Sequence, residues 1–239
     1  MVTGRERDDM IFDFRFWRGL ANQQELITNL GSSTMRDFKK RVWMVGLFGL
    51  LLFVLQEIWG MNSEQLTALY AFGGKDPYTI ARLVSLVGII IWAVIYMAFH
   101  FFGIAFLLNK LTGITLSKLA VLQLFVVSIL LIEKGLMFFI FVLTGTTTPI
   151  SLFSFGPLAT IVFENPFLIL FFNQLTIFTA LIIGLQTRFI RAFTEMNPRI
   201  IVSMLIAIHI AMSLITTAVG LLPLEDWFVS YVEGGASNE

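Results

Sequence analysis

The chain has 239 residues, of which 57% are hydrophobic and 13% charged, and its formal net charge at pH 7 is zero. Soluble domains carry about a quarter charged residues, so this composition excludes an ordinary water-soluble protein and predicts a chain embedded mostly in lipid. The chain has no cysteine, which excludes disulfides, thiol catalysis and thiolate metal sites.

Residues 1–41 form a basic leader that we expect in the cytoplasm. Segment 13–30, DFRFWRGLANQQELITNL, places its apolar residues on one helical face with arginines beside it. This pattern is typical of an amphipathic helix lying in the membrane interface, although it also suits a helix docked on the protein's own cytoplasmic loops. The residues predicted to contact lipid headgroups are Arg15, Trp17, Arg18, Lys39, Lys40 and Arg41.

Apolar runs long enough to cross a membrane dominate the rest of the chain. A hydrocarbon core of about 30 Å takes roughly 20 helical residues, and its backbone must be satisfied within each segment. The runs predict an all-α integral membrane protein with one membrane domain over residues 42–222. Its five predicted transmembrane helices are 42–60, 83–108, 119–144, 166–185 and 200–222.

The basic residues of the loops orient these spans. Thirteen Lys and Arg residues precede the first run or lie in the second-to-third and fourth-to-fifth loops, whereas the opposite side carries only Lys75 and Arg82. Short basic loops stay in the cytoplasm, so we expect the N-terminus inside and residues 223–239 as a short external acidic tail. The basic inner face suits anionic lipids, and no basic domain is large enough to read nucleic acid.

The third run contains two adjacent charges, Glu133 and Lys134, in the stretch LLIEKGLMFF. A re-entrant hairpin would place them at a water-facing turn. A break there would leave two pieces too short to cross the membrane singly, however. The sequence therefore favours a single helix that carries buried charge.

Several polar residues are predicted to share one layer in the outer half of the membrane. Membrane-embedded charges usually face the bundle interior and pair, and we expect Lys134 to pair with Glu57. The layer is either a structural clasp that fixes helix order, a proton or substrate path, or a docking surface for another membrane protein, and we favour the clasp. Its members are Glu57, Glu133, Lys134, Asn173, Gln174 and His209.

Segment 146–165 on the predicted outer side is apolar but interrupted by Pro149, Gly156 and Pro157. We expect it to pack on the outer end of the bundle or to dip into the interface, with a pore loop as the sharper alternative.

Motifs of known membrane and soluble enzymes do not occur in the sequence. No span contains an aspartate, there is no GxSxG or HExxH motif, and no glycine-rich phosphate loop is present. The sequence therefore predicts a non-catalytic protein without a cofactor or a metal site.

Two stretches carry a resemblance to a known family. The segments HFFGIAFLLNKLTGITLSKLAVLQLFVVSIL and NQLTIFTALIIGLQTRFIRAFTEMNPRIIVSMLIAI, the second with Gly184 and Leu185 near its inner end, resemble the second to fifth spans of the Yip domain family. These are five-span proteins named for interaction with Ypt/Rab GTPases. The chain lacks the DLYGP-like stretch of the eukaryotic branch, which favours the bacterial branch.

The resemblance implies a non-catalytic accessory or scaffold protein in a bacterial plasma membrane. Some bacterial members assist ABC exporters, so the implied partner is an ABC permease, its ATPase or a similar membrane protein, in export or antimicrobial-peptide resistance. Two other functions remain open: a small transporter or channel that uses the polar layer, and a lipid-interacting protein that shapes membranes through its leader helix.

Overall fold

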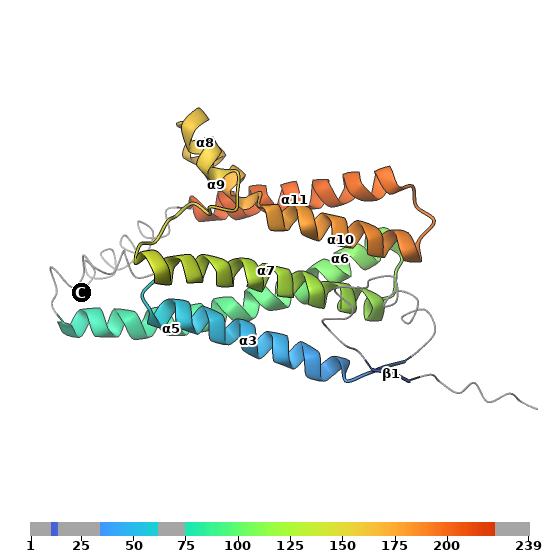
Figure 1. The fold of residues 1–239 in the computed structure, drawn as a ribbon, viewed down its shortest axis with the longest axis horizontal. Coiled ribbons are helices and arrows are strands. Elements are labelled where there is room, and N and C mark those ends of the chain that lie inside the picture. Colours follow the sequence, from blue (N-terminus) through green and yellow to red (C-terminus); the bar gives the residue numbers. More distant parts are fainter. Residues whose placement is uncertain (1–10, 14–33, 62–74, 223–239) are drawn as a thin grey trace, which may run out of the picture. The chain divides into compact units, whose positions relative to one another are not determined.

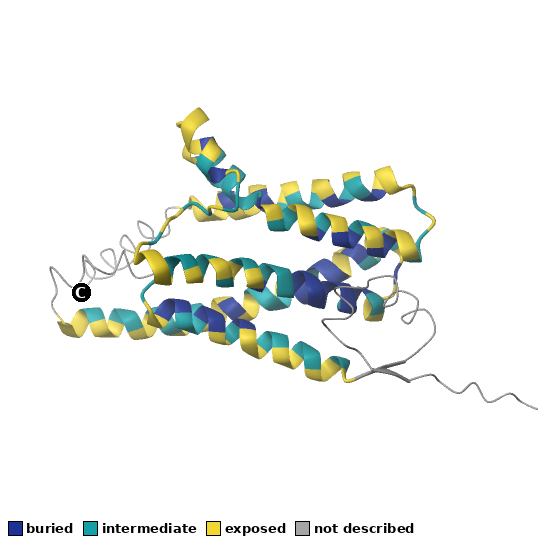
Figure 2. Cartoon of the chain, in the orientation of Figure 1, coloured by how far each residue is buried: buried dark blue, intermediate teal, exposed yellow. Residues whose placement is uncertain are grey.

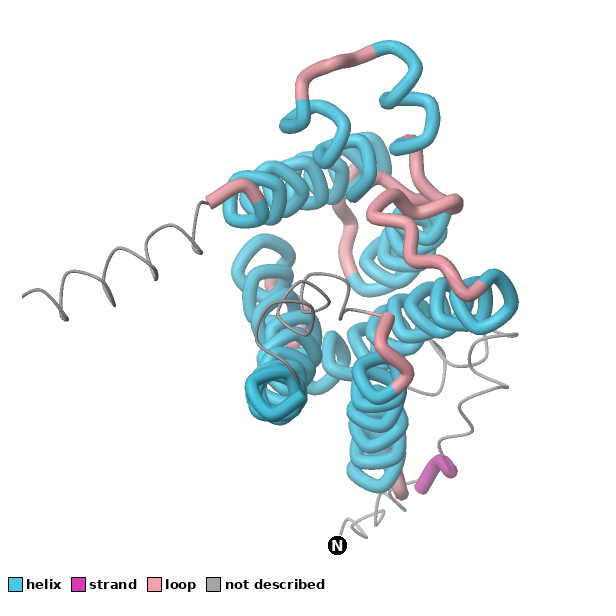
Figure 3. The backbone as a smooth tube through the Cα atoms, turned by 90° about the vertical axis from the view of Figure 1, so that its left-hand side faces the viewer, coloured by secondary structure: helices cyan, strands magenta, loops and turns pink. Residues whose placement is uncertain are grey.

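The computed structural model describes residues 11–13, 34–61 and 75–222, which are almost entirely helical (Figure 1; Figure 3). Two short strands, β1 (Ile11–Asp13) and β2 (Thr34–Arg36), pair in parallel. The helices in chain order are α3 (Phe38–Ile58), α5 (Lys75–Ala98), η2 (Phe99–Gly103), α6 (Ile104–Thr112), α7 (Leu116–Thr144), α8 (Gly156–Val162), α9 (Pro166–Gln174), α10 (Ile177–Phe193) and α11 (Pro198–Gly220).

Within the described residues, four helices are long and apolar enough to cross a membrane. They are α3 with 21 residues, the continuous helix α5–η2–α6 with 38, α7 with 29 and α11 with 23. They correspond to the predicted runs 42–60, 83–108, 119–144 and 200–222, so the expected helical class with membrane-length helices is confirmed. A fifth crossing and the orientation of the chain in the membrane stay predictions.

The third run is one uninterrupted helix, as the sequence favoured. Helix α7 passes through Glu133 and Lys134 without a break and ends only at Gly145, whose φ of 68° is left-handed. Glycine adopts this conformation without steric cost and commonly ends helices. The re-entrant hairpin is therefore wrong.

The fourth run, predicted as one helix over 166–185, is broken at Leu175 and Thr176 into α9 and α10. The backbone groups released by the break are bound by the preceding loop. The Phe155 N–H donates to the Leu175 carbonyl (3.1 Å), and the Ile177 N–H donates to the Phe153 carbonyl (3.0 Å). Irregular backbone can be buried in an apolar environment only when such partners are present.

Two parts of the predicted organisation differ from the structure or lie outside it. The basic residues Lys39, Lys40 and Arg41, placed in the leader, belong to the first turn of α3, which begins at Phe38. Most of the predicted leader helix over 13–30, with Arg15, Trp17 and Arg18, and the tail 223–239 lie outside the described residues.

The chain divides into two compact units. Unit 1 comprises Met1–Thr147 with Gly184–Ile201, and unit 2 comprises Thr148–Ile183 with Val202–Glu239. In unit 1, α3 packs against α5 and α7, while η2 and α6 pack against α7.

Helix α3 is closely packed at Gly49. A Cβ atom added at Gly49 would come within 2.5 Å of the Met97 sulfur and 2.9 Å of Leu131. The absence of a side chain at Gly49 thus permits a close approach of three helices.

The core of unit 1 lies around the N-terminal half of α7 and around α6. Every residue from 121 to 127 is buried, whereas the C-terminal half of α7 is largely half-buried or exposed (Figure 2). The helix that packs here contains η2, a single π-helical turn in which the Ile104 N–H donates to the Phe99 carbonyl five residues back. Fully buried side chains of this core include Leu108, Leu119 and Leu122.

In unit 2, α8 and α9 pack on each other as a short helical hairpin. The rings of Phe163 and Phe172 stack with centroids 5.5 Å apart, and Asn165 caps α9 by accepting from the Phe167 N–H. Leu158 and Ile161 of α8 are 61% and 81% exposed. Helix α8 lies in the predicted apolar segment 146–165, and its placement in the membrane interface stays a prediction.

Candidate functional site: buried polar clusters

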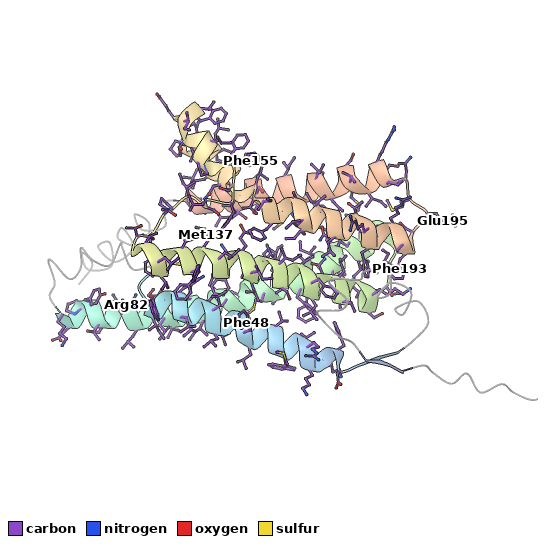
Figure 4. The ribbon with its side chains drawn as sticks, in the orientation of Figure 1. Phe48, Arg82, Met137, Phe155, Phe193 and Glu195 are labelled. Atoms are coloured by element: carbon purple, nitrogen blue, oxygen red, sulfur yellow. The ribbon has the colours of Figure 1, made fainter. Side chains whose placement is uncertain are left out.

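Among the described residues of unit 1, the most buried charge is Glu57, in the last turn of α3, with a side chain 2% exposed. Arg82 of α5 neutralises it, with Nη1 3.1 Å from Oε1 (Figure 4 labels Arg82). The Arg82 Nη2 also donates to the backbone carbonyls of Glu57 (2.6 Å) and Ile58 (3.2 Å). The guanidinium therefore pairs with the carboxylate and also satisfies carbonyls at the helix C-terminus, where positive charge is favourable.

The predicted pairing of Lys134 with Glu57 is wrong, because Arg82 takes that place. Arg82 was assigned to an external loop, but α5 begins at Lys75, so Arg82 lies in its third turn beside α3. Helices α3 and α7 are joined differently: the Gln56 Nε2 donates to the backbone carbonyl of Lys134 at 3.1 Å. Sequence reasoning missed Gln56 and Arg82, although Arg82 directly precedes an apolar run.

A second group in unit 1 contains Tyr96, His100, Glu133 and Lys134. The His100 Nδ1 lies 2.8 Å from the Tyr96 carbonyl, and since a carbonyl can only accept, Nδ1 carries the hydrogen. The rings of Tyr96 and His100 lie 4.3 Å apart. Tyr96 is within electrostatic range of Glu133, and His100 of Lys134.

In unit 2, Asn173 joins the end of α9 to the preceding loop. Its Oδ1 accepts from the Ser151 N–H (2.8 Å) and from the Ser154 hydroxyl (2.9 Å), while its Nδ2 donates to the Pro149 carbonyl (3.1 Å). A Cβ atom added at Gly156 would come within 2.9 Å of this Oδ1. Asn173 is thus a structural link that holds the loop against the broken helix.

The predicted polar layer therefore consists of two groups. Glu57, Glu133 and Lys134 lie in unit 1, whereas Asn173, Gln174 and His209 lie in unit 2. Both Gln174 and His209 are half-buried, and the Gln174 carbonyl accepts from the Thr179 hydroxyl at 3.5 Å. Whether the two groups form one layer stays a prediction.

Substituting Asn173 with alanine is expected to lower the free energy of unfolding by about 1 kcal/mol, because the Ser151 N–H loses its acceptor and the Pro149 carbonyl loses its donor. A denaturant titration of the purified protein in detergent measures the change. Gln174→Ala is the matched control, since it removes the neighbouring amide at the end of the same helix. Equal effects of the two substitutions would contradict the linking role of Asn173.

The core of unit 1 contains a polar side chain that sequence reasoning missed. Gln123 of α7 is 0% exposed, and within the described part of the chain neither atom of its amide group has a hydrogen-bond partner. Buried amides without partners are rare because their desolvation is costly. No distinctive sequence signal marks Gln123 beyond its being the one amide in a long apolar helix.

The basic flank of α3 is accessible. Lys39 and Lys40 are exposed, and Arg41 is half-buried with its Nη1 3.9 Å from the Met44 sulfur. Their contact with lipid headgroups stays a prediction. Among residues 11–13, 34–61 and 75–222, no group of three His, Cys, Asp or Glu side chains is arranged to hold a metal ion.

Comparison of the chain with models of known families, with curated proteins and with solved structures finds no match in any of the three.

Proposed function

We propose that this chain is a non-catalytic subunit of a larger membrane complex, which it stabilises or assembles through contacts between helices. The observation that carries the proposal is the Glu57–Arg82 pair. A carboxylate in a proton or substrate path must be free to exchange its partner. Here Arg82 donates one hydrogen bond to the Glu57 carboxylate and is itself fixed by two more to backbone carbonyls of α3. This arrangement favours the structural clasp over a transport path.

The resemblance to the Yip domain family gives the proposal its finer form. We propose five membrane crossings, of which the fourth in chain order is formed by α9 and α10 together. The N-terminus lies in the cytoplasm and the C-terminus outside. The proposed location is a bacterial plasma membrane, and the proposed partner is a permease or ATPase of an ABC exporter. The four membrane-length helices support the membrane setting, and the basic residues that flank them support the orientation.

Purification of the tagged chain from its native membrane in mild detergent tests this function. We expect subunits of another membrane protein to co-purify in a fixed ratio, as mass spectrometry of the eluate would identify. Recovery of a homo-oligomer alone would contradict the accessory role. A membrane protein of the same host with a similar number of spans, carrying the same tag, is the control for detergent carry-over.

A small transporter or channel is the second candidate, and two observations favour it. Gln123 buries an amide that has no hydrogen-bond partner among the described residues. The break between α9 and α10 interrupts an apolar segment, as in many transporters. This function predicts that the purified protein, reconstituted in liposomes, conducts an ion or transports a solute. Gln123→Leu should abolish that flux. The lipid-shaping function depends on the leader helix, most of which lies outside the described residues.

A further inference from the structure

Lys134 combines a packed backbone with an exposed side chain. Its carbonyl accepts from Gln56 of α3, and Leu131, one turn earlier on α7, lies against Gly49 of α3. The side chain of Lys134 is nevertheless exposed. Among the described residues the structure records an ion pair only between Arg82 and Glu57, so the acid expected to neutralise Lys134 is already occupied.

Lys134 lies far from both ends of α7. It is eighteen residues after Leu116 and ten before Thr144, which correspond to about 27 Å and 15 Å at 1.5 Å per residue. A lysine side chain spans less than half of the shorter distance, so the ammonium does not reach either end of α7 by snorkelling. An exposed charge at this depth in hydrocarbon is unfavourable, and such charges usually have a partner.

The described neighbouring groups in unit 1 do not supply that partner. Glu133 is adjacent in sequence, so its side chain leaves the helix about 100° away from that of Lys134, and it lies within electrostatic range of Tyr96. His100, the group within electrostatic range of Lys134, is neutral or positive and offers no negative charge. The second half of α7 also exposes the apolar residues Ile132, Leu136 and Phe139.

We propose that the exposed ammonium of Lys134 binds a carboxylate carried within a membrane-crossing helix of another subunit. The inference rests on the proposed accessory function and specifies its partner, a helix with an Asp or Glu in the membrane interior at the depth of Lys134. Charge complementarity selects this occupant, because an ammonium and a carboxylate that pair in lipid remove two unfavourable charges together. The exposed second half of α7 provides the apolar surface against which such a helix packs (Figure 2).

The test compares three variants in the native membrane: Lys134→Met, Lys134→Arg and, as the matched control that removes another positive charge from the same helix, Lys118→Met. Recovery of the partner that co-purifies with the wild type is the readout. We expect Lys134→Met to reduce this recovery by about tenfold or more, because the partner's carboxylate is left unpaired in lipid. Lys134→Arg and Lys118→Met should retain it. A reciprocal exchange, Lys134→Glu combined with a lysine in place of the partner's acid, should restore recovery.

The outcomes separate this inference from the proposed function. If the wild type recovers no partner, the accessory function fails. If the wild type and Lys134→Met recover the same partner equally, the function stands and the docking role of Lys134 is overturned.

Purified Lys134→Met should unfold at the same denaturant concentration as the wild type, since no ion pair within the described residues involves this side chain. Loss of stability in this variant would assign Lys134 to the internal clasp and overturn the inference. Loss of a homodimer would identify a second copy of the chain as the occupant, with the same consequence.

Discussion

Replacing Arg82 with methionine is expected to lower the free energy of unfolding by about 3–5 kcal/mol, the usual effect of removing one partner of a buried ion pair. The reason is that the carboxyl group of Glu57, 2% exposed, would be left buried without its partner. Two carbonyls at the end of α3 would also lose their donor. Denaturant titration of the purified protein in detergent, followed by circular dichroism, measures the change.

Two further variants interpret this result. Lys75→Met, at the exposed start of the same helix, removes a positive charge that has no buried partner and should change stability little. The double variant Glu57→Gln/Arg82→Met should recover much of the loss, because it removes the uncompensated charge. If Arg82→Met were no more destabilising than Lys75→Met, the pair would contribute nothing to the fold.

Replacing Gly49 with alanine should destabilise unit 1 by about 1–3 kcal/mol through overpacking. The new Cβ would lie 2.5 Å from the Met97 sulfur and 2.9 Å from a Leu131 methyl group, so α3, α5 and α7 would have to separate. The methionine side chain can yield in part because it is flexible, whereas Leu131 is 2% exposed and tightly enclosed. The same denaturant titration measures the effect.

Gly46, one turn earlier on the same helix, is the control. A Cβ there meets no atom within 4 Å, so Gly46→Ala should stabilise the helix by about 0.5–1 kcal/mol through its lower conformational entropy in the unfolded chain. Opposite signs for the two substitutions would confirm that α3 is closely packed at Gly49 and open at Gly46. Equal effects would contradict this packing.

The positions of the long helices could be predicted because hydrocarbon imposes one rule on every run. A segment of about 20 apolar residues must satisfy its own backbone, and this was sufficient to predict that α7 continues through Glu133 and Lys134. The break at Leu175 and Thr176 could not be found by this rule, since its backbone partners, Phe153 and Phe155, are supplied by another segment. The local signal was Thr176, whose hydroxyl accepts from the Thr179 N–H as a helix cap.

The ion pair of the candidate site was mispredicted for a related reason. Position along a helix follows from residue number, so Glu57 and Lys134 were correctly placed within long apolar helices, although only Glu57 is buried. Which residues face each other depends on helix rotation and on where α5 begins, and neither is fixed by an apolar run. Arg82 was assigned to a loop because the apolar run begins only at residue 83, whereas the helix α5 already begins at Lys75.

The π-helical turn η2 sets the direction in which the side chains of α5, the preceding part of the same helix, point around the helix axis. A π turn accommodates one residue more than an α turn, so the residues of α5 are displaced by about 100° around the axis relative to an unbroken α-helix continued from α6. Since α6 and η2 are packed against α7, this one extra residue sets the direction of Arg82, seventeen positions and about 25 Å earlier along the helix. The length of the chain at Phe99–Gly103 thus specifies which side chain reaches Glu57.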